Sequence, residues 1–342
     1  MELVGILAFI FALLFSVMVH EFGHYLTARR YGMRVSEFFV GFGTRIWSRQ
    51  RGETEFGIKA IPAGGYCRID GMTPRDEMPE GEEGRAFYRA SSGRKLIVLG
   101  AGSFLHFVLG YLLLFVLLAG IGVNQVLPVI DSVAPNSAAA AAGFQKGDQI
   151  IAIDSVPVAF YDEMSPLLQK KKNATAAFTV VRNADTVQLI SKVDKDGRVG
   201  IPYLTSEEYA AMGVIAIQVK KFGFFESFPA GVVKTFEKLK FYIDQFRLIL
   251  NPDTGAYKGI GGFKSMGSIF PSEWDWESFW NITALFSIIL AFMNLLPIPA
   301  LDGGHALFTI YEIITGRKPS DKFMEYAQMV GMVLLLGLML YA

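Results

Sequence analysis

The sequence predicts a polytopic α-helical membrane protein with about four transmembrane helices, a membrane-associated β-hairpin and an inserted α+β domain. Hydrophobic residues make up 52% of the 342 residues, which is more than ordinary soluble proteins contain. Four apolar stretches are long enough to cross a bilayer, and a region of mixed composition separates the second from the third. Basic and acidic residues number 32 each, so the net charge gives no indication of a nucleic-acid partner.

The first apolar stretch, from Leu3 to Ala28, carries the motif His20-Glu21-Phe22-Gly23-His24 near its end. Two histidines four residues apart share one face of a helix, so both imidazoles can bind one Zn²⁺, with Glu21 as a candidate general base. Ionisable side chains are costly to bury in lipid and therefore indicate a functional site. The alternatives are a chance match in a soluble core helix and a histidine pair satisfied by hydrogen bonds.

Basic residues indicate how this first span is oriented. Arg29, Arg30 and Arg34 follow it directly, which places its end in the cytosol. We therefore expect the N- and C-termini and the inserted domain to be extracytoplasmic, with the metal site in the membrane near the cytosolic surface. Glu2 stands where a signal peptide has basic residues, so we predict a retained span. The single cysteine, Cys67, excludes an internal disulfide framework and any Cys-rich zinc site.

Residues 35–69 change to the alternating pattern of strands around a polar turn and predict a β-hairpin. Backbone of this kind at membrane depth must contact protein or line a cavity, so we expect the hairpin to border the site. An ordinary cytosolic hairpin is the alternative. The edge of the predicted membrane-associated hairpin could accept an unwound substrate as an added strand, with Ile58, Gly64 and Gly65 as candidate contacts. Residues 71–93 predict a polar loop.

The second apolar stretch runs from Leu96 to about Ile121. Gly100, Gly102 and Ser103 give it a small-residue face for close helix packing. His106 also lies on this helix. It is either a further polar group near the metal or a hydrogen-bonded interior histidine.

Residues 126–204 have the composition of a soluble domain, and the run from Ala142 to Asp154 resembles the PDZ signature. Such a domain could capture an extended peptide or act as a steric gate. Residues 220–250 predict an amphipathic helix, either in the membrane interface or packed as a lid on this domain. The Gly-rich stretch 251–271 lacks the lysine and spacing of a phosphate-binding loop, so we predict no nucleotide.

The third apolar stretch, Phe279–Leu296, ends at Pro297-Ile298-Pro299, and the fourth covers about Phe323–Tyr341. Prolines and glycines unwind the chain after the third stretch at membrane depth. Asp302 follows the prolines and would complete a His₂Asp zinc site with one position left for water. The alternative is an aspartate that caps the next helix. We expect His305 to support the site or the start of that helix, without binding the metal directly.

Three motifs in this order resemble the site-2 proteases, intramembrane zinc metalloproteases, in the bacterial branch that carries a PDZ domain. They are His20–His24, the hairpin residues from Glu37 to Gly71, and the run from Asn294 to His305. The resemblance implies a multi-pass protein of the bacterial inner membrane. It also implies that Asn294 helps to hold the substrate backbone, and that the substrates are anti-sigma factors or remnant signal peptides.

Two departures from the family pattern are visible. Gly102-Ser103-Phe104-Leu105-His106 stands where the family usually has Gly-Pro-x-x-Asn, so His106 occupies the position of the asparagine. Residues 126–204 have room for one PDZ domain, whereas some members carry two.

These observations predict an intramembrane zinc metalloprotease that cuts within or near transmembrane segments. Two other classes of function remain as alternatives. A membrane scaffold acting through the PDZ domain would not need Glu21 beside both histidines. A metal transporter would need a line of polar residues across the whole span, which the third and fourth apolar stretches lack.

Overall fold

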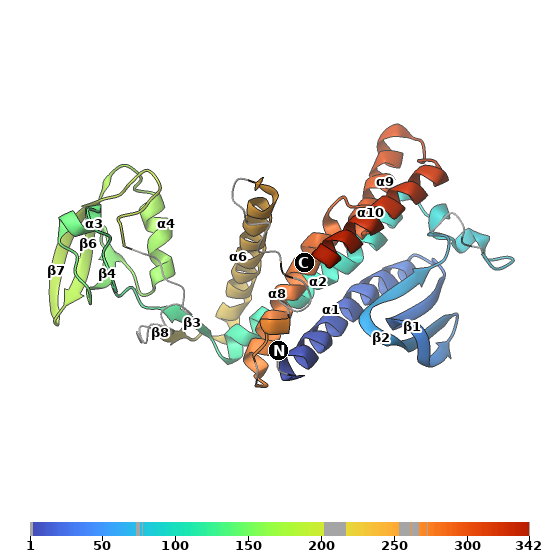
Figure 1. The fold of residues 1–342 in the computed structure, drawn as a ribbon, viewed down its shortest axis with the longest axis horizontal. Helices are drawn as coiled ribbons and strands as arrows, with labels where there is room; N and C mark the ends of the chain where they lie inside the picture. Colours follow the sequence, from blue (N-terminus) through green and yellow to red (C-terminus); the bar gives the residue numbers. More distant parts are fainter. Residues whose placement is uncertain are drawn as a thin grey trace. The chain divides into compact units, whose positions relative to one another are not determined.

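The computed structural model describes residues 3–72, 76, 78–201, 217–252, 261, 267–271 and 273–341. The chain forms two compact units (Figure 1). One unit joins Met1–Leu117 to Phe224–Ala342, and the other comprises Leu118–Gly223. We describe each unit by itself.

Three helices of the first unit are long and apolar enough to cross a membrane: α1 (Leu3–Arg30), α2 (Ser92–Gly120) and α8 (Trp276–Leu295). They confirm the prediction of an α-helical membrane protein, and the strands described below supply its β component. The fourth predicted span coincides with α10 (Asp321–Tyr341). Within the part of the chain that the structure describes, only the first three helices meet the length and composition expected of a span, so a fourth crossing stays a prediction.

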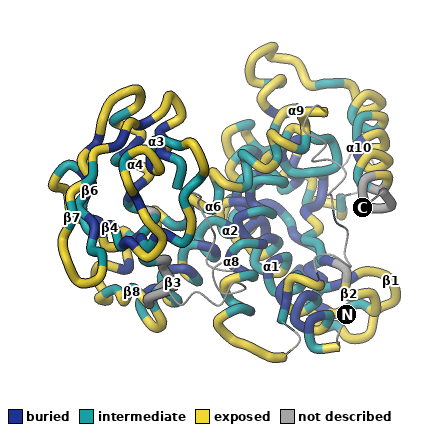
Figure 2. The backbone as a smooth tube through the Cα atoms, turned by 60° about the vertical axis from the view of Figure 1, so that its left-hand side comes forward, coloured by how far each residue is buried: buried dark blue, intermediate teal, exposed yellow. Residues whose placement is uncertain are grey.

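Aromatic packing joins the helices of the first unit. Phe9 of α1 contacts Phe286 of α8 edge to face, with ring centroids 5.9 Å apart. The buried positions follow the facing sides of α1, α2 and α8, whereas α10 is largely exposed (Figure 2). The core therefore lies between the three apolar helices.

The amphipathic segment forms α6 (Phe224–Leu250). Its first turns pack on α2, where the rings of Phe228 and Phe115 are 4.4 Å apart. Near its other end, the Phe246 ring lies 5.7 Å from Phe292 of α8. The helix thus lies along two predicted spans over much of its length, a position that neither the interface nor the lid alternative anticipated. Most of the Gly-rich stretch, residues 253–260 and 262–266, lies outside the described residues.

The predicted hairpin consists of β1 (Val35–Arg51) and β2 (Thr54–Ile69), which pair antiparallel. Its register is more elaborate than a simple hairpin, because residues 37–40 pair with residues 65–68 and also with 55–58. This part of β1 therefore lies between two segments of β2. The fold requires a sharp bend at Gly41, whose φ is +85° and where a Cβ would lie 2.8 Å from the Lys59 carbonyl oxygen.

A small core attaches this sheet to the helices. Val35 and Ile69 from the sheet pack with Val98 and Leu99 of α2 and with Phe87 of the following loop. That loop, predicted to be polar, contains two short 3₁₀ turns, Glu83–Arg85 and Phe87–Arg89. The buried ring of Phe87 helps to hold the sheet against the ends of α1 and α2.

The second unit contains a four-stranded sheet in the order β5-β4-β6-β7. The first and last strands of this unit, β3 and β8, pair antiparallel with each other in a separate sheet. Ile150 and Ile153 of β4 pack with Phe178 and Val180 of β6 in its core. These elements form an α+β domain in the predicted place. Their bounds are β3 (Val123–Val126), α3 (Ala138–Ala142), β4 (Gln149–Ile153), β5 (Val156–Pro157), α4 (Met164–Gln169), β6 (Thr175–Arg182), β7 (Asp185–Lys192) and β8 (Ile217–Lys220).

One buried ion pair ties β4 to β6 in this unit. Arg182 donates from Nε and from a terminal nitrogen to the two carboxylate oxygens of Asp148, at 2.6 and 2.7 Å. Asp148 is fully buried. Burial opposes its ionisation, but the Arg182 guanidinium and the Gln145 N–H hold the pKa of Asp148 below its usual range.

We expect acid to loosen this unit before it loosens the apolar helices. The folded pKa of Asp148 lies below the unfolded value of about 3.9, so its stabilisation is complete above that value and is lost as the pH falls through the folded pKa. At pH 7, Asp148→Asn should lower the free energy of unfolding by about 2–3 kcal/mol, because it leaves Arg182 without its carboxylate partner. Hydrogen exchange of β4 and β6 in the full chain, corrected for intrinsic rates, measures both the loosening in acid and the destabilisation by Asp148→Asn. Unchanged protection in the variant would contradict the assignment.

Candidate metal centre

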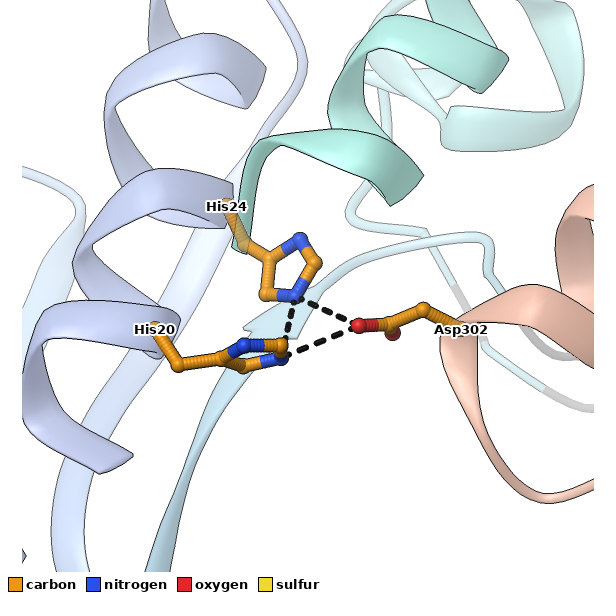
Figure 3. A group of neighbouring side chains, drawn as sticks. All are labelled: His20, His24 and Asp302. Atoms are coloured by element: carbon orange, nitrogen blue, oxygen red, sulfur yellow. Dashed lines mark hydrogen bonds and ion pairs between the residues drawn. The ribbon is translucent and has the colours of Figure 1, made fainter. Parts of the chain in front are cut away.

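Two histidines on α1 form one side of the candidate centre. His20 and His24 are each 7% exposed and lie one helical turn apart. Their Nε2 atoms are 3.1 Å apart, so both nitrogens converge on one point (Figure 3). The i, i+4 spacing of the two histidines therefore brings both Nε2 atoms close enough to bind one metal ion.

Asp302 supplies the other side, from the first residue of α9 (Asp302–Thr315). One of its carboxylate oxygens, Oδ2, lies 3.0 Å from His20 Nε2 and 3.2 Å from His24 Nε2 (Figure 3). Its side chain faces the histidines. The structure thus brings together three residues that are as much as 282 positions apart in the sequence.

The turn between α8 and α9 determines where Asp302 lies. Ala300 has a φ of +83°, a left-handed conformation that is unfavourable for a residue with a Cβ. Gly304 approaches the Ile298 carbonyl so closely that a Cβ would lie 2.5 Å from its oxygen. The prolines end α8, and this compact turn starts α9 with its first carboxylate facing α1.

The three donor atoms fit a divalent metal ion such as zinc. Tetrahedral zinc with bonds of 2.0–2.2 Å places its ligand atoms about 3.3–3.6 Å apart, slightly more than the 3.0–3.2 Å seen here. Asp302 Oδ2 is buried and has no hydrogen-bond partner among the described residues. A buried carboxylate oxygen without a donor, facing two imidazole nitrogens, is the arrangement that a cation would satisfy.

Neighbouring groups orient the two imidazoles. His24 Nδ1 lies 2.8 Å from the Val98 carbonyl oxygen of α2. A carbonyl only accepts, so Nδ1 carries the proton and the lone pair of Nε2 faces the metal position. On the other imidazole, His20 Nδ1 lies 3.5 Å from the side-chain amide of Asn294 on α8.

Glu21 is next to His20 on α1 and is partly buried. Its Oε2 accepts a hydrogen bond of 2.8 Å from the backbone N–H of Cys67 in β2. The candidate base is therefore held by the sheet that we predicted would border the site. The second carboxylate oxygen remains available for chemistry.

Glycines let the helices approach closely enough to build the centre. A Cβ at Gly102 of α2 would lie 2.5 Å from His20 Cε1 and 2.6 Å from His24 Nε2. A Cβ at Gly23 of α1 would lie 2.5 Å from the Ala101 carbonyl oxygen. Of the small residues predicted to form a packing face on α2, Gly102 packs against the imidazoles, whereas a Cβ at Gly100 would meet no atom within 4 Å.

His106 lies beside the centre and is also hydrogen-bonded, so both of its predicted roles describe it. Its ring centroid is 4.9 Å from that of His20. Its Nδ1 is 2.9 Å from Ser287 Oγ, and the Ser287 hydroxyl donates to the His106 carbonyl oxygen. His106 is almost completely buried and holds α2 against α8 next to His20.

The other predicted residues are spread around this centre. His305 lies one turn after Asp302 and contacts Gln328 of α10, with its Nε2 3.3 Å from the Gln328 side-chain nitrogen. Gly65 lies against α1, where its Cβ would be 3.4 Å from Val17. Gly64 packs on Phe42. Ile58 pairs with Val40 and Trp47, so it lies on the other side of β1 from residues 65–68 and is not brought to the centre.

Four groups that contact the predicted site residues were not predicted from the sequence: the Val98 carbonyl, the Cys67 N–H, Ser287 and Gln328. Backbone groups of residues distant in the sequence carry no signal in side-chain patterns. Ser287 is a polar residue on an apolar helix, and such residues can be searched for as partners of buried histidines.

We predict that Gly102→Ala will lower zinc affinity at least tenfold, because its Cβ would displace both imidazole rings. The matched control is Gly100→Ala on the same helix, where a Cβ would meet no atom within 4 Å. Zinc content after dialysis against graded chelator measures the difference. Equal affinity in both variants would show that the rings do not need this approach.

Comparison with known proteins shows similarity over most of the chain. The model of Peptidase family M50 matches residues 8–338. A Campylobacter jejuni protein named "putative zinc metalloprotease" is 33% identical over 346 residues, which cover 98% of this chain and 91% of that protein. Zinc metalloprotease Rip1 of Mycobacterium tuberculosis is 31% identical over 355 residues, which cover 92% of this chain and 87% of Rip1.

Proposed function

The chain belongs to Peptidase family M50, the site-2 protease family of intramembrane zinc metalloproteases, and on that premise we propose which residues carry out the reaction. His20, His24 and Asp302 hold the zinc, and Glu21 is the general base. The observation that carries this assignment is the convergence of two imidazole nitrogens on the one buried carboxylate oxygen that has no donor among the described residues.

Glu21 acts on the water that attacks the peptide. When bound, the zinc polarises the scissile carbonyl and makes that water more acidic. Glu21 takes the proton from the water and delivers it to the leaving nitrogen. The Cys67 N–H holds one carboxylate oxygen of Glu21 in place, so the other is directed to the reacting atoms.

The substrate must be presented as an extended strand. Peptide bonds of a transmembrane helix are already hydrogen-bonded and shielded, so the helix must unwind before hydrolysis. Residues 65–68 of β2 pair with β1 on one side, and on the other the Cys67 N–H points to Glu21. A substrate strand added at this edge would lie beside the base and the metal ligands.

Asn294 contributes to substrate binding in this proposal. It lies on the last turns of α8, and its side chain is 3.5 Å from His20 Nδ1. An amide at this place has both a donor and an acceptor, so it can bond to a substrate backbone next to the scissile bond. Of the predicted hairpin contacts, Gly65 keeps this role, whereas the position of Ile58 does not favour it.

The 118–223 unit is a PDZ domain in our proposal, and it selects substrates. A cavity with a volume of about 830 Å³ lies between α4 and residues 196–201. Met164, Leu168 and Val199 give it an apolar lining, which suits an extended peptide. The same unit could instead exclude substrates whose outer domains have not been trimmed. Anti-sigma factors and remnant signal peptides are the substrate classes that the family resemblance suggests.

The protein crosses the bacterial inner membrane four times in this proposal, with α10 as the fourth span. Arg29 and Arg30 end α1, and Arg94 and Lys95 open α2. These short basic flanks favour a cytosolic position for the sheet and for the end of the bundle that holds the metal.

The main test is cleavage of a model single-pass substrate by the detergent-purified protein. Glu21→Gln should lower kcat by at least 10³-fold while keeping about one zinc per chain, because the base is lost but the ligands remain. Asp302→Asn should lower both cleavage and zinc content. Full zinc content in Asp302→Asn would remove this residue from the ligand set. Zinc in every protein with cleavage in none, over several substrates, would favour a scaffold.

The orientation is tested by cysteine labelling in a Cys67→Ala background. Ala60→Cys lies in the sheet and Lys195→Cys in the 118–223 unit, and both positions are exposed. A membrane-impermeant maleimide should label residue 195 in intact spheroplasts and residue 60 only in inside-out vesicles, because the charge pattern places them on opposite sides. Labelling of residue 60 from outside would contradict the topology.

A further inference from the structure

A cavity of about 370 Å³ lies next to the metal centre and has no role in the reaction described above. One wall is the segment of β2 that contains Tyr66, Cys67 and Ile69. The opposite wall is α10, through Gln328 and Met332, and His305 and Ala300 close the side toward α9. All of these residues belong to the first unit.

On two sides of the cavity, lining residues adjoin the candidate reacting groups. Cys67 donates its N–H to the candidate base Glu21. Ala300 and His305 flank Asp302, the candidate ligand, along the chain. A strand added at the edge of residues 65–68 would therefore pass from the metal centre into this cavity.

The far end of the cavity is charged. The guanidinium of Arg68 lies 3.7 Å from the Asp76 carboxylate and 3.5 Å from that of Glu37. Both Arg68 and Asp76 line the cavity. A substrate strand would thus run from a buried reaction centre toward a polar end that tolerates water.

The wall formed by α10 has a fixed position at this level. A Cβ at Gly331 would overlap the Pro299 carbonyl oxygen, so α10 touches the turn before Asp302 at a point between Gln328 and Met332. Residues i, i+3 and i+4 share one helical face, so Gln328, Gly331 and Met332 all face the turn and the cavity.

His305 and Gln328 both line this cavity, and their polar side chains meet between α9 and α10. Their nearest nitrogens are 3.3 Å apart, and one must accept while the other donates. An amide paired with one imidazole nitrogen still has donor and acceptor positions left over. A polar substrate side chain entering here could bond to them, whereas an apolar one would leave them unpaired.

We infer that this cavity is a side-chain subsite for a substrate residue next to the scissile bond, and that His305 and Gln328 make it selective for a hydrogen-bonding side chain such as Ser, Thr or Asn. The inference rests on the proposed peptidase reaction and on strand addition at residues 65–68. It assigns Gln328 as a specificity-determining residue of α10.

The first experiment measures specificity. A single-pass substrate carries Ser, Asn, Ala or Leu at each of the three positions on either side of its cleavage site. At one position the wild type should prefer Ser or Asn over Leu by roughly tenfold in kcat/KM. Gln328→Leu should abolish this preference without changing zinc content, and the control Tyr326→Leu, on an exposed part of α10, should keep it. If Gln328→Leu lowers kcat/KM equally on all substrates, or leaves the preference unchanged, the inference is overturned.

The second experiment does not depend on cleavage. In a Glu21→Gln, Cys67→Ala background, a cysteine at position 328 should form a disulfide with a cysteine at one or two adjacent substrate positions, and a cysteine at 326 should not. No cross-link at 328 in a protein whose parent cleaves the substrate would refute the subsite and leave the proposed function intact. A specific cross-link without any cleavage by the zinc-loaded parent would show that the cavity binds peptide, but it would count against the proposed reaction and therefore against a subsite for it.

Discussion

The constraint on which the structure depends is the cost of placing ionisable groups between apolar helices. Asp302 Oδ2 is buried without a donor among the described residues, and the Nε2 atoms of His20 and His24 lie 3.0 and 3.2 Å from it. Without a cation, such an arrangement would be strongly unfavourable. We therefore expect a bound metal to help keep α9 against α1, so that the centre would contribute to folding as well as to chemistry.

Close backbone approach is the second requirement, and glycines meet it. Gly23 lets α1 approach the Ala101 carbonyl of α2. Gly102 lets α2 approach the imidazoles of His20 and His24 on α1. The same closeness brings the Val98 carbonyl to His24 and the Cys67 N–H to Glu21. Two of the four side chains in the proposed active site are thus oriented by the backbone, which cannot change its chemistry by point mutation.

The sequence predicted the apolar helices, the strands of residues 35–69, the inserted α+β domain and the convergence of His20, His24 and Asp302. These predictions depend on periodicity and on side-chain chemistry, which a sequence shows directly. The double pairing of residues 37–40 was not predictable, because it depends on left-handed turns at Gly41 and Gly43. Nor was the path of α6 along α2 and α8, since an amphipathic pattern shows which face is apolar and not what covers it. Gln328 gave no signal because it lies 26 positions after Asp302 on a different helix.

The contact between Gly331 and Pro299 has a consequence for the range of peptides that this protein can accept. α10 is mostly exposed to its surroundings, yet at this point only a hydrogen atom separates its backbone from the turn before Asp302. The separation between α10 and this turn is therefore as small as any residue allows. A larger side chain at position 331 would push α10 away from the turn and widen the cavity that we propose as a subsite, so this glycine would govern how bulky a substrate residue fits there.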